Sequence, residues 1–183
     1  MTGPPLTFPG LDGSPADAFA DAVAPLFEAA PRFVARLASA RPFGSSTELF
    51  ARARSIAHAM PVGEQVELID AHPRLGAPPG SVSALSFVEQ GYDRPDADTA
   101  AEAERLELVD QLARLNAVYE RRFGFRFCVF VAGRPRAALV LEMSQALKSE
   151  RTSEIDRALD AVIDIAADRY ASLTAPSPEG ATR

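Results

Sequence analysis

Apolar residues recur with a helical period along most of the chain, and this pattern constrains the fold more than any other feature. The longest such stretch, residues 97–122, has one apolar face with spacings of four, three and four: Leu108, Leu112, Leu115, Tyr119. Helical patterns also cover residues 16–28, 137–147 and 153–171. The segment FCVFVA (127–132) resembles a strand, but one short strand cannot form a sheet. We therefore predict an all-α fold, a single-domain helical bundle.

The length and composition fit one domain with a sizeable core. The chain has 183 residues, of which 47% are hydrophobic and 24% are charged, so it is not a disordered sequence. No internal repeat and no linker rich enough to divide the chain is visible. We expect an extended N-terminal segment over residues 1–14, an all-helical domain over 15–172 and a flexible tail over 173–183.

Charge and cysteine content exclude several classes of partner. The net charge of −6 argues against nucleic acid and against an anionic membrane surface, because both require a basic face. The longest apolar run is far too short to span a bilayer, and no signal peptide is visible. A single cysteine, Cys128, excludes an internal disulfide, and two histidines leave a metal site poor in ligands. We expect a cytoplasmic protein with no metal.

One of the two histidines directly precedes a proline, in the segment DAHPRLGAPPG (70–80). Proline crowds the preceding residue out of the α region, so His72 is expected where a helix ends and a loop begins. The following segment, residues 73–95, is rich in proline and long for a connection in a compact domain, which is typical of functional loops. His72 is therefore a candidate for catalysis, with a polar loop residue as the alternative.

Within this loop, the island SALSFVEQ offers Ser86, Glu89 and Gln90. Ser86 and Glu89 match a capping box, in which a serine begins a helix and a glutamate follows three residues later. The same spacing would aim Glu89 and Gln90 from a fixed helix start. A structural role and a catalytic role for Glu89 both remain open at this point.

A second pattern, RRFGFRFCVF, ends the long helix. Gly124 suits the left-handed position that terminates a helix, and the chain after it should be extended. The N–H groups of Phe127, Cys128 and Val129 could then donate to a substrate, or they could pair with a neighbouring segment. We interpret Cys128 as a buried, inert thiol and His58 as a packing residue within a helix.

Four motifs, in this order, resemble those of the OHCU decarboxylase family: LFEAAPRF, LIDAHPRLG, SFVEQ and LNAVYERRFGFRF. The resemblance extends over roughly residues 6–171. Members of the family convert 2-oxo-4-hydroxy-4-carboxy-5-ureidoimidazoline (OHCU), an intermediate of urate breakdown, into (S)-allantoin. The resemblance implies an all-α carboxy-lyase that acts on a small-molecule substrate, uses no cofactor and commonly forms a homodimer.

The resemblance also implies roles for individual residues. The catalytic histidine of the family falls on His72, as proton donor, and its active-site glutamate falls on Glu89. The substrate-binding positions fall on Pro73, Ser86, Gln90, Phe125, Arg126, Phe127, Cys128 and Val129.

The chain departs from the family near the start of the last helix, where Ala146 and Ser149 replace an arginine and an asparagine. A carboxylate that enters a partly dry pocket loses hydration, which paired charge or several donors must offset. We therefore predict that another cation replaces the arginine. The candidates are Arg126, which lies in the segment expected to line the pocket, and Lys148 or Arg151 near the altered site.

Two alternatives to OHCU decarboxylation follow from the same residues. The departures near the last helix motivate a decarboxylase-like enzyme that acts on another small carboxylated N-heterocycle. A non-catalytic helical binding module is the third hypothesis, and it predicts that His72→Ala and Glu89→Ala leave activity and ligand affinity unchanged.

Overall fold

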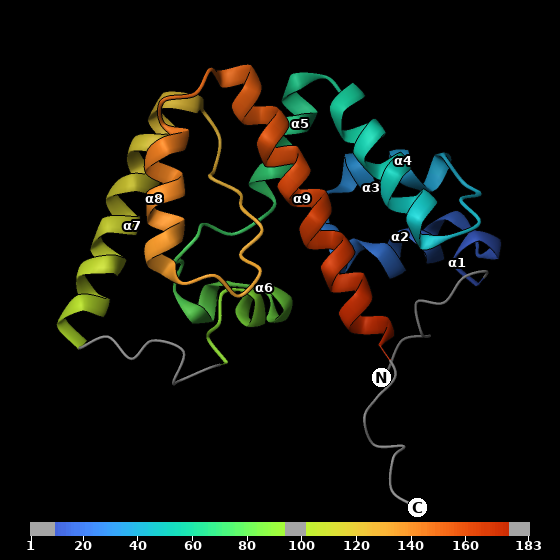
Figure 1. Ribbon diagram of the computed structural model, residues 1–183. Helices are drawn as coiled ribbons and strands as arrows, with labels where there is room; N and C mark the ends of the chain where they lie inside the picture. Colours follow the sequence, from blue (N-terminus) through green and yellow to red (C-terminus); the bar gives the residue numbers. More distant parts are fainter. Residues whose placement is uncertain (1–9, 94–101, 176–183) are drawn as a thin grey trace, which may run out of the picture.

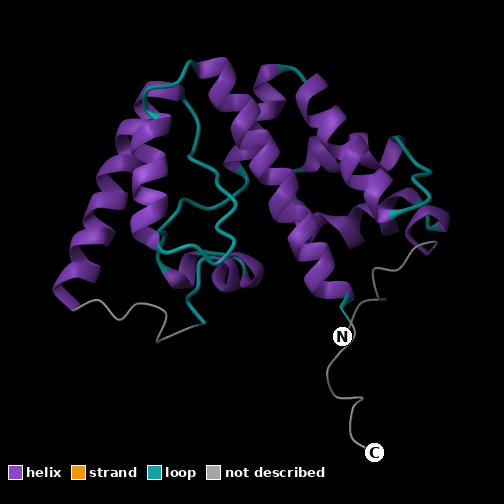
Figure 2. Ribbon diagram, in the orientation of Figure 1, coloured by secondary structure: helices purple, strands orange, loops and turns teal. Residues whose placement is uncertain are grey.

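The computed structural model describes residues 10–93 and 102–175, which form helices and loops without a strand (Figure 2). The predicted all-α fold is confirmed. The elements are, in order, α1 (Gly10–Gly13), α2 (Ala16–Val23), the 3-10 helix η1 (Ala24–Phe27), α3 (Pro31–Ser39), α4 (Ser46–Ala59), α5 (Val62–Asp70), the 3-10 helix η2 (Pro79–Ser81), α6 (Ala84–Glu89), α7 (Glu102–Phe123), α8 (Arg136–Ala146) and α9 (Arg151–Thr174).

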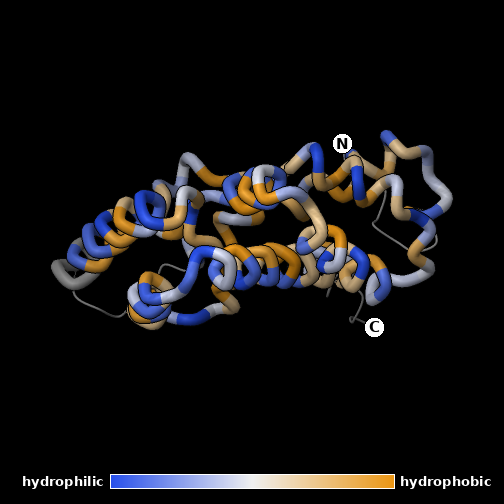
Figure 3. The backbone as a smooth tube through the Cα atoms, turned by 90° about the horizontal axis from the view of Figure 1, so that it is seen from above, coloured by the Kyte–Doolittle hydropathy of each residue, from blue (hydrophilic) through white to orange (hydrophobic). Residues whose placement is uncertain are grey.

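Helix α9 is the centre of the fold, and it crosses the molecule between the α1–α5 half and the α7–α8 pair (Figure 1). It packs against α4, α5 and η1. One face of α9 is buried because apolar residues follow each other at helical spacing, as the sequence predicts: Ile155, Leu159, Val162, Ile163, Ala166. Seen from above, apolar segments gather along the middle of the molecule (Figure 3).

On the far side of α9 the long helix α7 packs along α8. Helix α7 ends at Phe123, and Gly124 follows with φ of 77°, the left-handed conformation predicted for it. The strand-like segment 127–132 is extended but forms no strand, because no second strand lies beside it in the described part of the chain. The part of the predicted helix at 97–101 lies outside the described residues.

Three expectations about local structure differ from the structure. The tail predicted from residue 173 begins as helix, because α9 continues to Thr174. The N-terminal segment is not extended up to residue 14, because α1 buries Leu11 while Asp12 accepts hydrogen bonds from the N–H groups of Phe43 and Gly44. The capping-box interpretation is wrong: Ser83 caps α6 by accepting from the N–H of Ser86, which frees Ser86 for other contacts. No helix in the described ranges has the length and apolar character needed to cross a membrane.

Candidate active site

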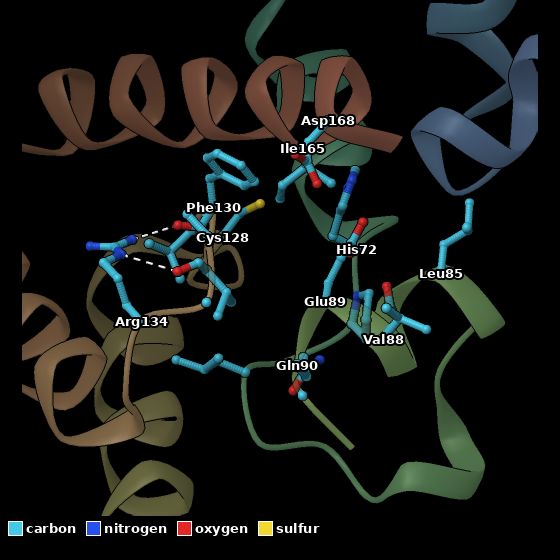
Figure 4. A pocket seen from close by; sticks show the side chains of 18 of the residues that line it. His72, Leu85, Val88, Glu89, Gln90, Cys128, Phe130, Arg134, Ile165 and Asp168 are labelled. Atoms are coloured by element: carbon cyan, nitrogen blue, oxygen red, sulfur yellow. Dashed lines mark hydrogen bonds between the residues drawn. The ribbon is translucent and has the colours of Figure 1, made fainter. Parts of the chain in front are cut away.

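A pocket of about 1050 Å³ lies between α6, α9, the loop that follows α5 and the segment 127–136, which is extended up to residue 131, turns at residues 132 and 133 and leads into α8. In Figure 4, His72 and Glu89 lie on one side of the pocket, and Phe130 and Arg134 lie on the opposite side. The pocket brings together parts of the chain that are far apart in sequence. Within the described residues, no group of histidine, cysteine and carboxylate side chains could hold a metal ion.

His72 lies just after the end of α5 and is almost completely buried, with 4% of its surface exposed. Its Nδ1 lies 3.4 Å from the carbonyl oxygen of Leu68, which can only accept a hydrogen bond. Nδ1 therefore carries the proton in the neutral ring, and Nε2 has a free lone pair. No partner for Nε2 exists among the described residues, although the atom is buried. Because His72 is one of the residues that line the pocket, this unpartnered nitrogen makes it a candidate for contact with a bound molecule.

Burial lowers the pKa of His72 to about 4, because desolvation disfavours the imidazolium and the positive charge of Arg169 acts in the same direction. His72 is accordingly neutral near pH 7. The imidazole begins as a hydrogen-bond acceptor and a base, and it can donate a proton only after it has received one.

A buried arginine on α9 organises the polar end of the pocket. The guanidinium of Arg169 binds both carboxylate oxygens of Glu89, at 2.5 and 2.8 Å, and one oxygen of Glu28 at 2.8 Å. It also donates to Ser86 Oγ at 3.0 Å and to the carbonyl oxygen of Pro25 at 2.9 Å. Because the guanidinium is planar and offers five donors, these contacts fix the orientation of the Glu89 carboxylate.

The two carboxylates around Arg169 differ in their electrostatics. Burial raises the pKa of Glu89 above its ordinary value, although the hydrogen bonds and charge of Arg169 oppose this. Burial also raises the pKa of Glu28, but hydrogen bonds from Ser86 and Ser83 and the charge of Arg169 outweigh it, so the pKa of Glu28 is lowered. Glu28 is therefore the fixed anion of the cluster, and Glu89 is the carboxylate that protonates more readily.

The extended segment on the other side of the pocket has its carbonyl groups bound by arginines. Arg157 donates to the carbonyl oxygen of Cys128 at 2.9 Å, and Arg134 donates to those of Phe130 and Val131. The N–H groups of residues 127–129 have no acceptor among the described residues. These N–H groups can therefore donate to a bound molecule, as the sequence analysis considered.

Most of the residues expected to form the site line the pocket: His72, Pro73, Ser86, Glu89, Gln90, Phe127, Cys128 and Val129. Phe125 does not, because its ring is buried against Tyr119 and Phe123. Gln90 lines the pocket, but its amide oxygen already accepts from the N–H of Gly76 at 2.9 Å. The Cys128 thiol is buried and its pKa is raised to about 12 by desolvation, which agrees with an inert thiol.

Arg126 lies outside the pocket lining and has a different role from the one expected. Its guanidinium donates to the carbonyl oxygens of Asp70 (2.7 Å) and His72 (3.0 Å), and its backbone N–H donates to the Asp70 carboxylate at 2.7 Å. These bonds join the end of α5 to the extended segment. Arg126 thus holds the backbone of His72 in place, while Lys148 and Arg151 do not line the pocket either.

Sequence reasoning missed Arg169 and Glu28. A signal existed for Arg169, because it follows Val162 and Ala166 at spacings of four and three, on the buried face of α9. A cation at such a position needs buried partners. For Glu28, the only indication in the sequence was its place in the LFEAAPRF motif, which resembles the family. In the structure Glu28 and Ala29 both have positive φ, 49° and 57°, which turns the chain sharply before α3.

This chain is similar to proteins of one family over most of its length. The sequence model described as OHCU decarboxylase matches residues 12–171. An OHCU decarboxylase of Haloferax volcanii is 31% identical over 160 residues, covering 85% of this chain and 91% of its own length. The mouse OHCU decarboxylase (Mus musculus) is 30% identical over 161 residues, which is 85% of each chain.

A longer relative and a solved structure extend the comparison. The uric acid degradation bifunctional protein PucL of Bacillus subtilis is 29% identical over 168 residues, covering 92% of this chain and 33% of PucL. A crystal structure of OHCU decarboxylase in the presence of (S)-allantoin superposes with a TM-score of 0.63 at 22% identity, covering 84% of this chain and 97% of that chain, and it shows the same fold. Together, the match over residues 12–171 and the relative in Haloferax volcanii show that this chain belongs to the OHCU decarboxylase family.

Proposed function

We propose that this chain decarboxylates OHCU to (S)-allantoin in urate degradation. The observation that carries the proposal is the buried His72 ring, which lines the same pocket as a Glu89 carboxylate fixed by Arg169 and whose Nε2 has no partner among the described residues. Membership of the family and the names of the relatives support the same reaction. A small carboxylated molecule suits a pocket with polar groups at one end and apolar walls.

The reaction needs no electron acceptor beyond the substrate. In OHCU one ring carbon, C4, carries the carboxylate and a hydroxyl, and its neighbour C5 is doubly bonded to a ring nitrogen. When the bond from C4 to the carboxylate breaks, CO2 leaves and the electron pair forms a C4–C5 double bond. The electrons of the C=N bond move to the ring nitrogen, which takes one proton from water. We therefore propose that no cofactor takes part.

His72 fits the proton transfer that remains. The resulting enol becomes (S)-allantoin when the C4 hydroxyl loses its proton and C5 gains one. Because Nε2 of the neutral ring has a free lone pair, it can accept the hydroxyl proton and then donate it to C5. A ring held at a fixed position delivers that proton to one face of the enol, which would set the configuration of the product.

The other groups orient the substrate in this proposal. Glu89, held by Arg169, accepts hydrogen bonds from the N–H groups of the ureido substituent or the ring. N–H groups of the segment from Phe127 to Val129, which have no acceptor among the described residues, donate to the ring carbonyl, which shares the negative charge of the adjacent ring nitrogen by conjugation. Both contacts would place the carboxylate out of the ring plane, which loss of CO2 requires.

The test generates the unstable substrate in the cuvette from urate with urate oxidase and 5-hydroxyisourate hydrolase. Circular dichroism then follows the formation of (S)-allantoin. We expect this chain to give the S enantiomer rapidly, and His72→Gln to give only the slow, racemic background. A wild-type signal no faster than that background would refute the function. We further propose a cytoplasmic homodimer, and sedimentation velocity tests the assembly.

A further inference from the structure

The polar end of the pocket has no spare positive charge for a carboxylated substrate. Arg169 is bound by two carboxylates, Glu89 and Glu28, and Asp168 lies on the same side of the pocket. His72 is neutral, so it contributes no positive charge. The whole chain also carries a net charge of −6, which repels an anion at long range. A substrate carboxylate therefore needs a cation elsewhere in the pocket.

Two further arginines line the pocket, and they differ in one respect. Arg134 forms an ion pair with Glu142 at 2.6 Å and donates to the carbonyl oxygens of residues 130 and 131. Arg136, the first residue of α8, has no carboxylate partner among the described residues. Its guanidinium carbon lies 5.3 Å from the centre of the Tyr92 ring, which also lines the pocket.

Hydrogen bonds hold the Tyr92 ring of the Arg136–Tyr92 pair in place, close to the end of α6. The Tyr92 hydroxyl donates to the carbonyl oxygen of Ala77 at 2.6 Å and lies 3.2 Å from the amide oxygen of Gln90. Gln90 directly follows Glu89 at the end of α6. A guanidinium held over an aromatic ring keeps its N–H edges available, so it can bind a carboxylate with two parallel hydrogen bonds.

Resting on the proposed function, we propose that Arg136, held over Tyr92, is the cation that binds the carboxylate of the substrate. This assignment makes Arg136 a specificity-determining residue, which selects carboxylated heterocycles over neutral ones such as the product. Loss of CO2 removes the charge that Arg136 binds, so the product is held less tightly than the substrate. Loss of CO2 thus also favours release of the product that forms after the proton transfer.

The test compares Arg136→Gln with Arg134→Gln, which removes an equal charge from the same pocket but from an arginine already paired with Glu142. We expect Arg136→Gln to raise KM for in situ generated OHCU about tenfold or more, with kcat changed about twofold or less. Inhibition by (S)-allantoin, which has no carboxylate, should be unchanged. Arg134→Gln should raise KM several-fold less than Arg136→Gln does, because the charge of Arg134 is already balanced by Glu142.

A binding experiment keeps this inference separate from the proposed function. Calorimetry with hydantoin-5-acetate and 5-methylhydantoin needs no turnover, and the two probes differ by the carboxylate. The wild type and Arg134→Gln should prefer the carboxylated probe, and Arg136→Gln should lose the preference. Absence of that preference in the wild type, or an equal loss in both variants, would overturn the role of Arg136 whether or not OHCU is converted. If the wild type prefers the carboxylated probe but does not convert OHCU, the proposed reaction is refuted and the role of Arg136 is not.

Discussion

The buried state of His72 makes the unfolding free energy depend on pH in a defined direction. The ordinary pKa of histidine is 6.5, and in the folded protein desolvation and the charge of Arg169 lower the pKa of His72 to about 4. Between these values the unfolded chain binds more protons than the folded chain. The contribution of His72 to stability is therefore complete above about pH 6.5 and decreases as the pH falls toward about 4.

The magnitude follows from the two pKa values. At about pH 5 the unfolded histidine is almost fully protonated, whereas about one folded molecule in ten is protonated at His72. Moving from about pH 8 to about pH 5 should then lower the unfolding free energy by about 2 kcal/mol through this residue. Other groups also titrate in this range, so the measurement needs a variant that removes His72 alone.

The variant is His72→Gln, and the assay is urea unfolding of both proteins at about pH 8 and about pH 5. We expect the wild type to lose about 2 kcal/mol more than the variant over this range. The chain has two histidines, so ¹⁵N-edited NMR can assign both rings by this one substitution. The spectra should show His72 neutral at pH 7 with its proton on Nδ1. A protonated His72 at pH 7, or equal pH dependence in both proteins, would refute the reasoning.

Four further substitutions test other parts of the site. Glu89→Gln should lower kcat/KM by about 100-fold while the protein stays folded, because the amide cannot replace the oriented carboxylate; a change only in melting temperature would leave Glu89 a structural role. Arg169→Lys should lower the unfolding free energy by about 3 kcal/mol, since an ammonium cannot replace the planar guanidinium. Arg126→Lys should lower kcat about tenfold with little change in KM, because it loosens the His72 backbone; equal changes in both constants would contradict a positioning role. Cys128→Ala should keep kcat within about threefold, and the wild-type thiol should resist Ellman's reagent until the protein unfolds.

The helices could be predicted from the sequence because each long one packs a single face against the core. The apolar stripe of α9 begins and ends within a few residues of the predicted range, 153–171. The position of His72 could also be predicted, since proline at residue 73 decides where α5 must end. These features could be predicted because the residues that determine them, the apolar stripe of a helix and the proline after His72, are close in sequence to the structure they produce.

The burial of His72 and the partners of Glu89 could not be predicted in this way. Neighbours in sequence give no indication that Arg169, 80 residues after Glu89, would bind both of its oxygens. The capping-box pattern at Ser86 was misleading for a related reason. Ser83 is also a serine suited to a helix start, three residues earlier, and Glu28 from a distant turn accepts hydrogen bonds from both hydroxyl groups.

Arg126 shows how one residue can be placed in the correct neighbourhood and given the wrong role. A cation beside a donor segment can bind a substrate, or it can bind the carbonyl groups left free at the end of a helix. In this fold the end of α5 lies beside the extended segment. The carbonyl oxygens of Asp70 and His72 therefore lie within hydrogen-bond distance of the Arg126 guanidinium. Bonds to fixed carbonyl groups of the same chain form without a substrate, so the structural role takes precedence.

The buried charges on α9 are better explained by function than by stability. Replacing a buried ion cluster with well-packed apolar residues of similar volume is often neutral or stabilising, because desolvation opposes the Coulomb attraction. The rest of the inner face of α9 is apolar, so an apolar residue at position 169 would continue it. The fold therefore does not need Arg169, Glu89 and Glu28 together. A pocket that must hold a carboxylate in one orientation beside a neutral imidazole does need them, and this requirement accounts for a charged residue at a core position.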